Sequence, residues 1–349
     1  MRRTKAPFVN SKGKQMVIRR RFTAGAAALA AQLAVSVSMA AIPVAALAQD
    51  AWPSKPIKLI VPFAPGGNTD TIARLTAERL SKAIPAVFVV ENMAGAGGLT
   101  ATNTVAKAAP DGYTLFLVAS PQLAIVPALQ TVSFDPIKDF TPIKNIAFNP
   151  FVLIVHKSFP AGNLKEMLDW ARANTDKLTY ASGGVGSVSH LSSALLFSKA
   201  KATVKHVPYR GNAPAQVDVL AGHVPMMFSN LSDALTQIKN ADLRFFAVSS
   251  AKRSPQLPDV PTVQEQGVDG FDTGAWNGLV GPANLPAAIV SRLEKALTEF
   301  LKEPATQKRF AELGLEPDVG SSGDFAAQIK KDIPLWADIV KLAGARTQP

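Results

Sequence analysis

Short apolar runs alternate with amphipathic stretches along most of this chain, beginning with the run Ile57–Phe63. Short runs rich in β-branched residues are typical of buried strands, whereas apolar residues three and four positions apart predict helices. A regular alternation of the two predicts an α/β fold, in which a parallel-dominated sheet carries helices on both faces. The predicted strands are Ile57–Phe63, Val87–Val90, Tyr113–Val118, Phe151–His156, Leu178–Ala181, Thr203–Val207, Val224–Phe228, Leu243–Val248 and Ala275–Val280.

Helical spacing follows most of these strands. Pro286 would begin the most clearly amphipathic helix, because proline is favoured in the first turn. Pro334 would kink or split the last helix, since a proline inside a helix removes a main-chain hydrogen bond. The predicted helices are Asp70–Ile84, Leu99–Ala108, one capped by Asn163, Val188–Lys199, Ala213–Ala221, Leu231–Lys239, one from Pro286, Ala305–Leu313 and Asp324–Leu342.

Two predicted strands end in a glycine-rich turn that leads directly into a helix. Gly66 and Gly67 lie in the first turn, and Ser182–Ser187 forms the second. A helix start carries free N–H groups and the positive end of the helix dipole, so it suits an anion such as a carboxylate. An ordinary strand–helix turn has the same pattern, so one turn alone leaves both interpretations open. Two such starts about a domain apart are what a two-lobed binding protein needs.

Polar residues at the carboxyl ends of other strands are further candidates, because ligands bind at that edge of open parallel sheets. Ser120 and Gln122 follow the third predicted strand, and Asn230 follows the seventh. Gln122 could equally belong to a plain polar loop. Arg210 is the strongest candidate for a cationic contact, since its guanidinium matches a carboxylate, although a solvated surface arginine is the alternative.

Several chemistries are not indicated by the residues. Neither G-x-G-x-x-G nor G-x-x-x-x-G-K-[ST] occurs in the first turn, which argues against a dinucleotide or a nucleoside triphosphate. Cysteine is absent, which excludes disulfides, thiolate metal sites and a cysteine nucleophile. The histidines lack metal-binding spacing, and Ser187 is not in a G-x-S-x-G motif. His190 could donate to an anion or pack against its own helix. We therefore expect no catalytic residue, no metal and no cofactor.

The first 48 residues have the pattern of an export signal. They hold eight basic residues and no acidic one, and an alanine-rich stretch, Ala24–Ala48, follows. Ala46–Ala48 fits an A-x-A cleavage site. Arg19–Arg21 resembles a twin-arginine signal, but an ordinary secretory signal has the same charge, so both export routes stay open, as does a true start at Met16. A retained membrane anchor is disfavoured, because polar residues and a proline interrupt the stretch.

This segment also accounts for the basic character of the chain. The formal net charge is +11, and cleavage after residue 48 would remove eight positive charges, leaving +3. Nucleic-acid binding would need basic residues clustered on the folded part, and no later stretch has such a cluster with interleaved aromatics. We therefore expect a periplasmic protein without a nucleic-acid partner.

Seven ordered segments resemble the extracytoplasmic substrate receptors of tripartite tricarboxylate transporters, often called Bug proteins. Each segment alone is weakly specific, but together they span nearly all of the chain after residue 48. They are WPSKPIKLIVPFAPGGNTDTIAR (Trp52–Arg74), VVENMAGAGG (Val89–Gly98), AAPDGYTL (Ala108–Leu115), YASGGVGSVSHL (Tyr180–Leu191), VPYRGNAPAQVDVLAGHV (Val207–Val224), AVSSAKRSPQLPDVPTVQEQG (Ala247–Gly267) and AWNGLVGPANLPAAIVSRL (Ala275–Leu293).

The resemblance implies a two-lobed, type II periplasmic-binding-protein fold, also called a Venus flytrap. We expect the first crossing between the lobes near Phe148–Phe151 and the return between Ser249 and Gly274. The expected organisation is therefore a signal peptide at residues 1–48, lobe 1 at 49–150 plus 272–349, and lobe 2 at 151–271.

In the family that the chain resembles, both turns hold a ligand carboxylate, largely through main-chain N–H groups and bridging water. Asn68 and Thr69 depart from the usual first turn, and Pro121 and Gln122 replace what is often a smaller, more polar loop, so specificity does not transfer. The residues matched to the two turns are Gly66, Gly67, Asn68, Thr69, Asp70, Ser182, Gly183, Gly186, Ser187 and His190.

The resemblance implies a monomeric extracytoplasmic solute receptor, not an enzyme, that captures a small carboxylate between its lobes. It would deliver that ligand to the subunits of a membrane transporter. A sensor that reports the ligand to a signalling protein would have the same folded chain. A hydrolase is a weaker alternative, because no paired acid–base constellation is present.

Overall fold

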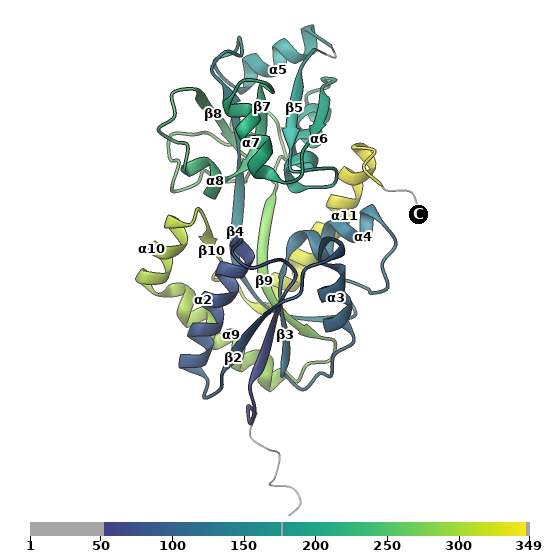
Figure 1. Cartoon of the computed structure of the whole chain (residues 1–349), viewed down its shortest axis with the longest axis vertical. Coiled ribbons are helices and arrows are strands. Elements are labelled where there is room, and N and C mark those ends of the chain that lie inside the picture. The colour runs from purple at the N-terminus through teal and green to yellow at the C-terminus, as the bar shows by residue number, and fades with distance from the viewer. Residues whose placement is uncertain (1–51, 176, 347–349) are drawn as a thin grey trace, which may run out of the picture. The chain divides into compact units, whose positions relative to one another are not determined.

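The computed structural model describes residues 52–175 and 177–346, and the chain from Trp52 onward forms one compact unit. Strands and helices alternate along this unit, which confirms the predicted α/β class (Figure 1). The predicted signal peptide lies outside the described residues. Within them, no helix combines the length and the apolar character needed to cross a membrane.

Ten described strands form one sheet in the order β2-β1-β3-β9-β4-β7-β5-β6, with β8 and β10 also paired to β4. Most predicted strands are present within a few residues of their predicted bounds. The strands are β1 (Ile57–Val61), β2 (Phe88–Asn92), β3 (Thr114–Ala119), β4 (Phe140–His156), β5 (Thr179–Ser182), β6 (Lys205–Pro208), β7 (Met226–Asn230), β8 (Leu243–Val248), β9 (Gly274–Pro282) and β10 (Glu316–Pro317).

The sheet is mixed and not dominated by parallel pairs, which corrects the prediction on that point. Parallel pairing joins β1 to β2 and β3, and β5 to β6 and β7. The long strands β4 and β9 run antiparallel to each other and to most of their other neighbours. Strand β4 carries the chain from one part of the sheet to the other, and β9 carries it back (Figure 1). Because the two strands cross in opposite directions, they pair antiparallel.

Strand β4 changes partner along its length. It pairs with β9 up to Pro150 and with β7 from Phe151 onward. We call the strands up to this change the first sheet segment (β1, β2, β3, β9, β10 and the first part of β4). The second sheet segment holds β5–β8 and the rest of β4. A division into lobes at residues 150/151 and 271/272 stays a prediction, because the described chain clusters as one unit.

The predicted strand Phe151–His156 begins too late, because β4 also includes the eleven residues 140–150. Prolines, asparagines and a lysine interrupt the apolar pattern there. Pairing with β9 overrides that local pattern, and two irregularities in the register accommodate Pro142 and Asn145. Lys144 is fully buried in this stretch, and its ammonium group donates to the main-chain oxygen of Gly320. Tertiary contacts, and not the local sequence pattern, therefore determine that residues 140–150 form a strand.

Helices cover both faces of the first sheet segment. Helices α2 and α9 pack on one face against β1 and β3, while α3 and α11 pack on the other. The helices are α2 (Asn68–Ala83), α3 (Leu99–Ala106), α4 (Val126–Leu129), α5 (Leu164–Ala173), α6 (Val188–Lys199), α7 (Asn212–Leu220), α8 (Leu231–Leu235), α9 (Ala287–Lys302), α10 (Pro304–Glu312) and α11 (Ser322–Leu342), with short helical turns η2 (Ala96–Gly98) and η3 (Pro121–Ile125).

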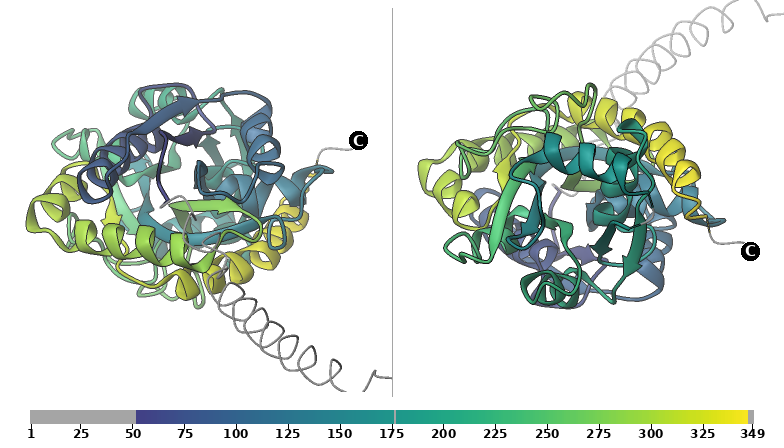
Figure 2. Two further views of the ribbon diagram at one scale, coloured as in Figure 1. Left: turned by 90° about the horizontal axis from the view of Figure 1, so that it is seen from below. Right: turned by 90° about the horizontal axis from the view of Figure 1, so that it is seen from above.

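Helix α11 links the two sheet segments. Phe325 near its start packs in the cluster of the first segment, whereas Trp336 and Ile339 pack in the main cluster of the second. The helix lies on the outside of the unit in both views of Figure 2. Pro334 lies inside it without ending it, so the predicted split does not occur.

Candidate functional site

The first glycine turn is held in shape by Asp70. Its carboxylate is 3% exposed and accepts hydrogen bonds from Gly66 N (2.9 Å), Asn92 Nδ2 (2.9 Å) and Arg74 Nε (2.9 Å) and Nη2 (3.0 Å). These bonds, led by Arg74, lower the pKa of Asp70 to about 2. Its acceptors are therefore occupied by the protein, so Asp70 shapes the turn and does not present a side chain to a ligand.

The main-chain N–H groups of this turn are free. Helix α2 begins at Asn68, with Gly67 as the N-cap and no side-chain cap. Thr71 N bonds to Gly67 O, so the amides from Gly67 to Asp70 precede the helical hydrogen bonds and have no acceptor within the described chain. A helix of 16 residues adds the positive end of its dipole at the same point. The start of α2 therefore suits an anion.

The second turn satisfies most of its own donors. Gly183 N donates to Ser189 Oγ (3.0 Å), Gly184 N to Ser182 Oγ (3.1 Å) and Gly186 N to His190 Nδ1 (3.1 Å). Ser187 caps α6 by accepting from His190 N. The predicted glycine donors are thus in use, and the free donors at this end are the first amides of α6, at Val188 and Ser189.

His190 packs against His206 and Tyr180 and accepts a hydrogen bond from its own turn. Its ring stacks on His206 with 3.9 Å between ring centroids and is 4% exposed. Burial and the neighbouring His206 lower its pKa to about 4, so the ring is neutral near pH 7. Because Nδ1 accepts from Gly186, the proton of the neutral ring resides on Nε2. His190 lines a surface hollow of about 520 Å³ beside the end of α11.

Both helix starts are attached to β9. Asn277 Nδ2 donates to Thr69 Oγ1 (2.9 Å) in the first turn of α2, and Ser192 Oγ of α6 donates to Thr273 Oγ1 (2.9 Å), one residue before β9. Thr273 directly precedes β9 and is four residues from Asn277, which is about 13 Å along an extended chain. The structure therefore brings the two predicted turns to one strip of sheet.

Ser120 and Gln122 are buried at the carboxyl end of β3. Ser120 Oγ accepts from Trp276 N (3.4 Å), which connects β3 to β9. Gln122 Nε2 donates to Gly97 O (3.0 Å), which fixes the amide orientation, and its Oε1 has no partner among the described residues. Gln122 is therefore more than a polar loop residue, because it closes the turn after β2 and leaves a buried acceptor.

Arg210 and Asn230 lie at the carboxyl ends of β6 and β7. The loop of Arg210 adjoins the second turn, since Gly211 N donates to Gly183 O (3.2 Å), and the Arg210 side chain is exposed. Asn230 Nδ2 donates to Asp233 in the first turn of α8. The predicted site residues thus lie in the turns that follow strands and in the first turns of α2 and α6, although Asp70 and His190 have structural partners.

Sequence reasoning missed two asparagines on the crossing strands, Asn149 on β4 and Asn277 on β9. Both are buried. Asn149 precedes the predicted strand Phe151–His156, and Asn277 lies in the predicted apolar strand Ala275–Val280. The available signal was the single polar residue inside such an apolar strand, because a buried amide requires hydrogen-bond partners.

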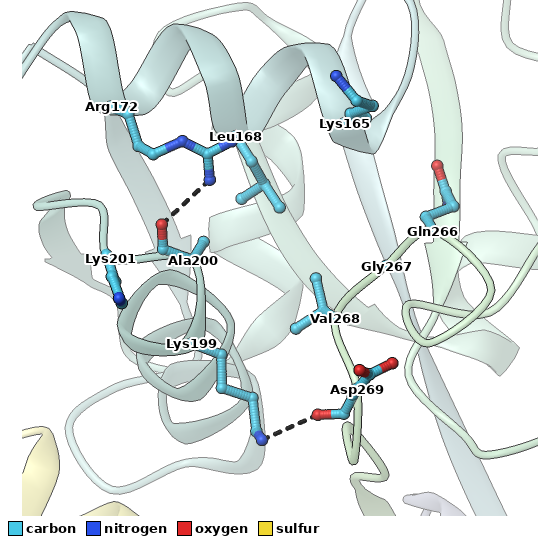
Figure 3. A pocket seen from close by; sticks show the side chains of 10 residues that line it. All are labelled: Lys165, Leu168, Arg172, Lys199, Ala200, Lys201, Gln266, Gly267, Val268 and Asp269. Atoms are coloured by element: carbon cyan, nitrogen blue, oxygen red, sulfur yellow. Dashed lines mark hydrogen bonds between the residues drawn. The ribbon is translucent and has the colours of Figure 1, made fainter.

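A separate hollow of about 590 Å³ lies at the other end of α6. Figure 3 shows Arg172 donating to Ala200 O (3.1 Å) and Lys199 to Asp269 O (2.9 Å) around it. A helix of 12 residues is about 18 Å long, so this hollow is far from the second turn. Arg172 binds the C-cap residue of α6, whereas Lys199 binds the loop that contains Asp269. No group of three or more potential metal ligands occurs in the described chain.

Comparison with known proteins matches this geometry to one family. The family model described as tripartite tricarboxylate transporter family receptor matches residues 72–345, just after the first turn. Protein BugT of Bordetella pertussis is 31% identical over 320 residues, which are 91% of this chain and 98% of BugT.

Two solved structures that carry ligands are also similar. The R. palustris Rpa4515 structure with adipate is 35% identical with a TM-score of 0.73, covering 84% of this chain and 99% of that chain. MatC (Rpa3494) from Rhodopseudomonas palustris with bound malate is 34% identical with a TM-score of 0.69, covering 83% of this chain and 100% of that chain.

Proposed function

This chain belongs to the tripartite tricarboxylate transporter receptor family, and we propose that it captures a small carboxylate in the periplasm and delivers it to a membrane transporter. The resemblance found in the sequence is thus confirmed. The family and its solved members are solute receptors and not enzymes, which sets the hydrolase alternative aside. Delivery to transporter subunits, export by the N-terminal signal and a monomeric state are parts of the proposal.

One observation carries the proposal: one short stretch of chain bonds to both helices, with Asn277 of β9 held to Thr69 in the first turn of α2 and Thr273, just before β9, held to Ser192 in the second turn of α6. The free amides from Gly67 to Asp70 supply donors for one carboxylate, and each hydrogen bond to a charged group contributes about 1.5–3 kcal/mol. The first amides of α6 supply donors from the second sheet segment. A ligand that contacts both helix starts would favour the arrangement in which they lie close together.

The ligands of similar structures support a carboxylate. Adipate and malate are both small dicarboxylates, and they occur in two structures that are 35% and 34% identical to this chain. A small acid is also what a helix start bordered by glycines accommodates, because the absent side chains let the ligand reach the main chain.

A thermal-shift screen of the purified receptor tests this function. The panel holds mono-, di- and tricarboxylic acids, amino acids and the methyl esters of the same acids. We expect at least one acid to raise the melting temperature and its ester to leave it unchanged, because the ester has no anionic head group. An ester that stabilises the protein as well as its acid would contradict the proposed site. Co-purification with transporter membrane subunits would separate transport from sensing.

A further inference from the structure

Asn149 lies on the strip of sheet between the two helix starts. In the register of β4 and β9, Asn149 is opposite Ala275 and Ala147 is opposite Asn277, with no irregularity between them. Residues opposite each other share a face, as do residues two apart on one strand. Asn149 and Asn277 are therefore diagonal neighbours on one face, and Asn277 bonds to Thr69 at the start of α2.

The opposite face of the same strands belongs to α11. Phe148 packs in the cluster that contains Phe325 of α11, and Trp276 Nε1 donates to Asp332 Oδ2 (2.8 Å) of that helix. Asn149 alternates with Phe148, so its side chain leaves the sheet on the side away from α11.

The amide of Asn149 has no hydrogen-bond partner within the described residues. The side chain is 6% exposed, and its Oδ1 is fully buried and unpaired. Folded proteins pair nearly all buried polar groups, since an unpaired one costs free energy. Asn277, its diagonal neighbour, does have a protein partner. The unpaired amide of Asn149 thus points to a partner that arrives with the ligand.

We propose that Asn149 is a ligand-contacting residue that selects acids carrying a hydroxyl group. This inference rests on the proposed function, because it assumes that a carboxylate is held at the helix starts. An amide has a donor end and an acceptor end, and a hydroxyl can pair with either. A second carboxylate could accept only from Nδ2 and would leave the buried Oδ1 unpaired, whereas a hydroxyl can donate to it. An ammonium group would need a carboxylate beside it, and the nearby Asp70 is already saturated by Gly66, Arg74 and Asn92.

Calorimetric titration of the purified receptor with matched pairs of acids tests this selectivity. Succinate is paired with malate, and glutarate with 2-hydroxyglutarate. We expect the hydroxylated acid of at least one pair to bind about tenfold more tightly, which is a typical effect of satisfying one buried polar group. In Asn149→Leu, which keeps the branched shape but has no polar atom, that ratio falls to about one. Asn149→Ala serves the same purpose if leucine prevents folding.

Asn145→Leu is the matched control. Asn145 is also a buried asparagine on β4 with an unpaired Oδ1, but its Nδ2 bonds to Asp318, outside the strip. This variant should keep the wild-type ratio. Wild-type protein that binds both acids of each pair equally, or Asn149 variants that keep the preference, would overturn the inference while leaving carboxylate binding intact. Absence of binding by all four acids would overturn it too, and absence of binding by every acid of the thermal-shift screen would overturn the proposed function itself.

Discussion

Asn68 at the start of α2 donates from Nδ2 to Ser232 Oγ in the first turn of α8, at 3.1 Å. This bond joins the first sheet segment to the second across 164 positions of sequence. Beside it, a Cβ on Gly314 would lie 2.6 Å from the main chain of Ser232, so only glycine allows this close approach. The two sheet segments therefore touch next to the free amides of the first turn.

Loss of this bond should weaken ligand binding. Asn68→Ala removes a neutral hydrogen bond worth about 1 kcal/mol from the arrangement in which the segments touch, so we expect the dissociation constant to rise about fivefold. Ser232→Ala should have a similar effect, and the double variant should be no worse than either single one, because both remove the same bond. Calorimetry with the tightest acid of the screen measures this. Thr236→Ala, which removes only local bonds to Asp233 and Gln237 just after α8, is the control.

Asp70→Asn should destabilise the fold in a pH-dependent way. The pKa of Asp70 is lowered to about 2 from an ordinary value of 3.8, so its stabilising effect is present above about pH 4 and is lost as the pH falls toward 2. Water screens Arg74, which is 56% exposed, so we expect at most about 2 kcal/mol. Urea unfolding at pH 7 and pH 2.5 measures the difference between the variant and the parent. If the variant and the parent differed in unfolding free energy by the same amount at pH 7 and pH 2.5, the role of the carboxylate would be contradicted.

The histidine pair should make the protein less stable in mild acid. The pKa values of His190 and His206 are both lowered to about 4 by burial, from an ordinary 6.5. The unfolded chain therefore binds about two more protons between pH 6.5 and pH 4, and stability falls as the pH falls through this window. Urea unfolding from pH 7.5 to 4.5 gives the slope. His206→Phe keeps an aromatic ring against His190 and should halve the slope, whereas an unchanged slope would assign it to other groups.

The sequence predicted most elements of the fold because their signals are local. Val188–Lys199 and Leu243–Val248 have the predicted bounds, since glycine turns or apolar runs mark their ends. The start of β4 could not be predicted, because Lys144 and Asn145 are buried only by partners about 175 residues away. A polar residue whose partner is distant looks like a loop residue in the sequence.

The location of the candidate site could be predicted from the sequence, whereas the hydrogen bonds within it mostly could not. Glycine and cap residues identified both helix starts correctly. Whether a donor is free depends on side chains that fold back onto the turn, as His190 does onto Gly186 and Asp70 onto Gly66. Asn149 could not be found at all, because only the pairing of β4 with β9 brings it between the two helices.

Gly67→Ala should separate binding from folding. Gly67 has φ −84° and ψ 173°, which any residue adopts, and a Cβ there would meet nothing within 4 Å. We therefore expect stability within about 1 kcal/mol of the parent, since the entropic gain and the poorer N-cap offset each other. The new methyl group would nevertheless stand at the start of α2 and keep a carboxylate from the free amides.

The expected loss of affinity is at least about tenfold, because one or more charge-assisted hydrogen bonds would be broken. Calorimetry with the tightest acid and a melting curve without ligand measure the two effects. Gly323→Ala is the matched control, since it places a methyl group in the first turn of α11, where the nearest atom is 3.5 Å away, and should leave binding unchanged. Parental affinity in Gly67→Ala would mean that the carboxylate does not bind at the start of α2.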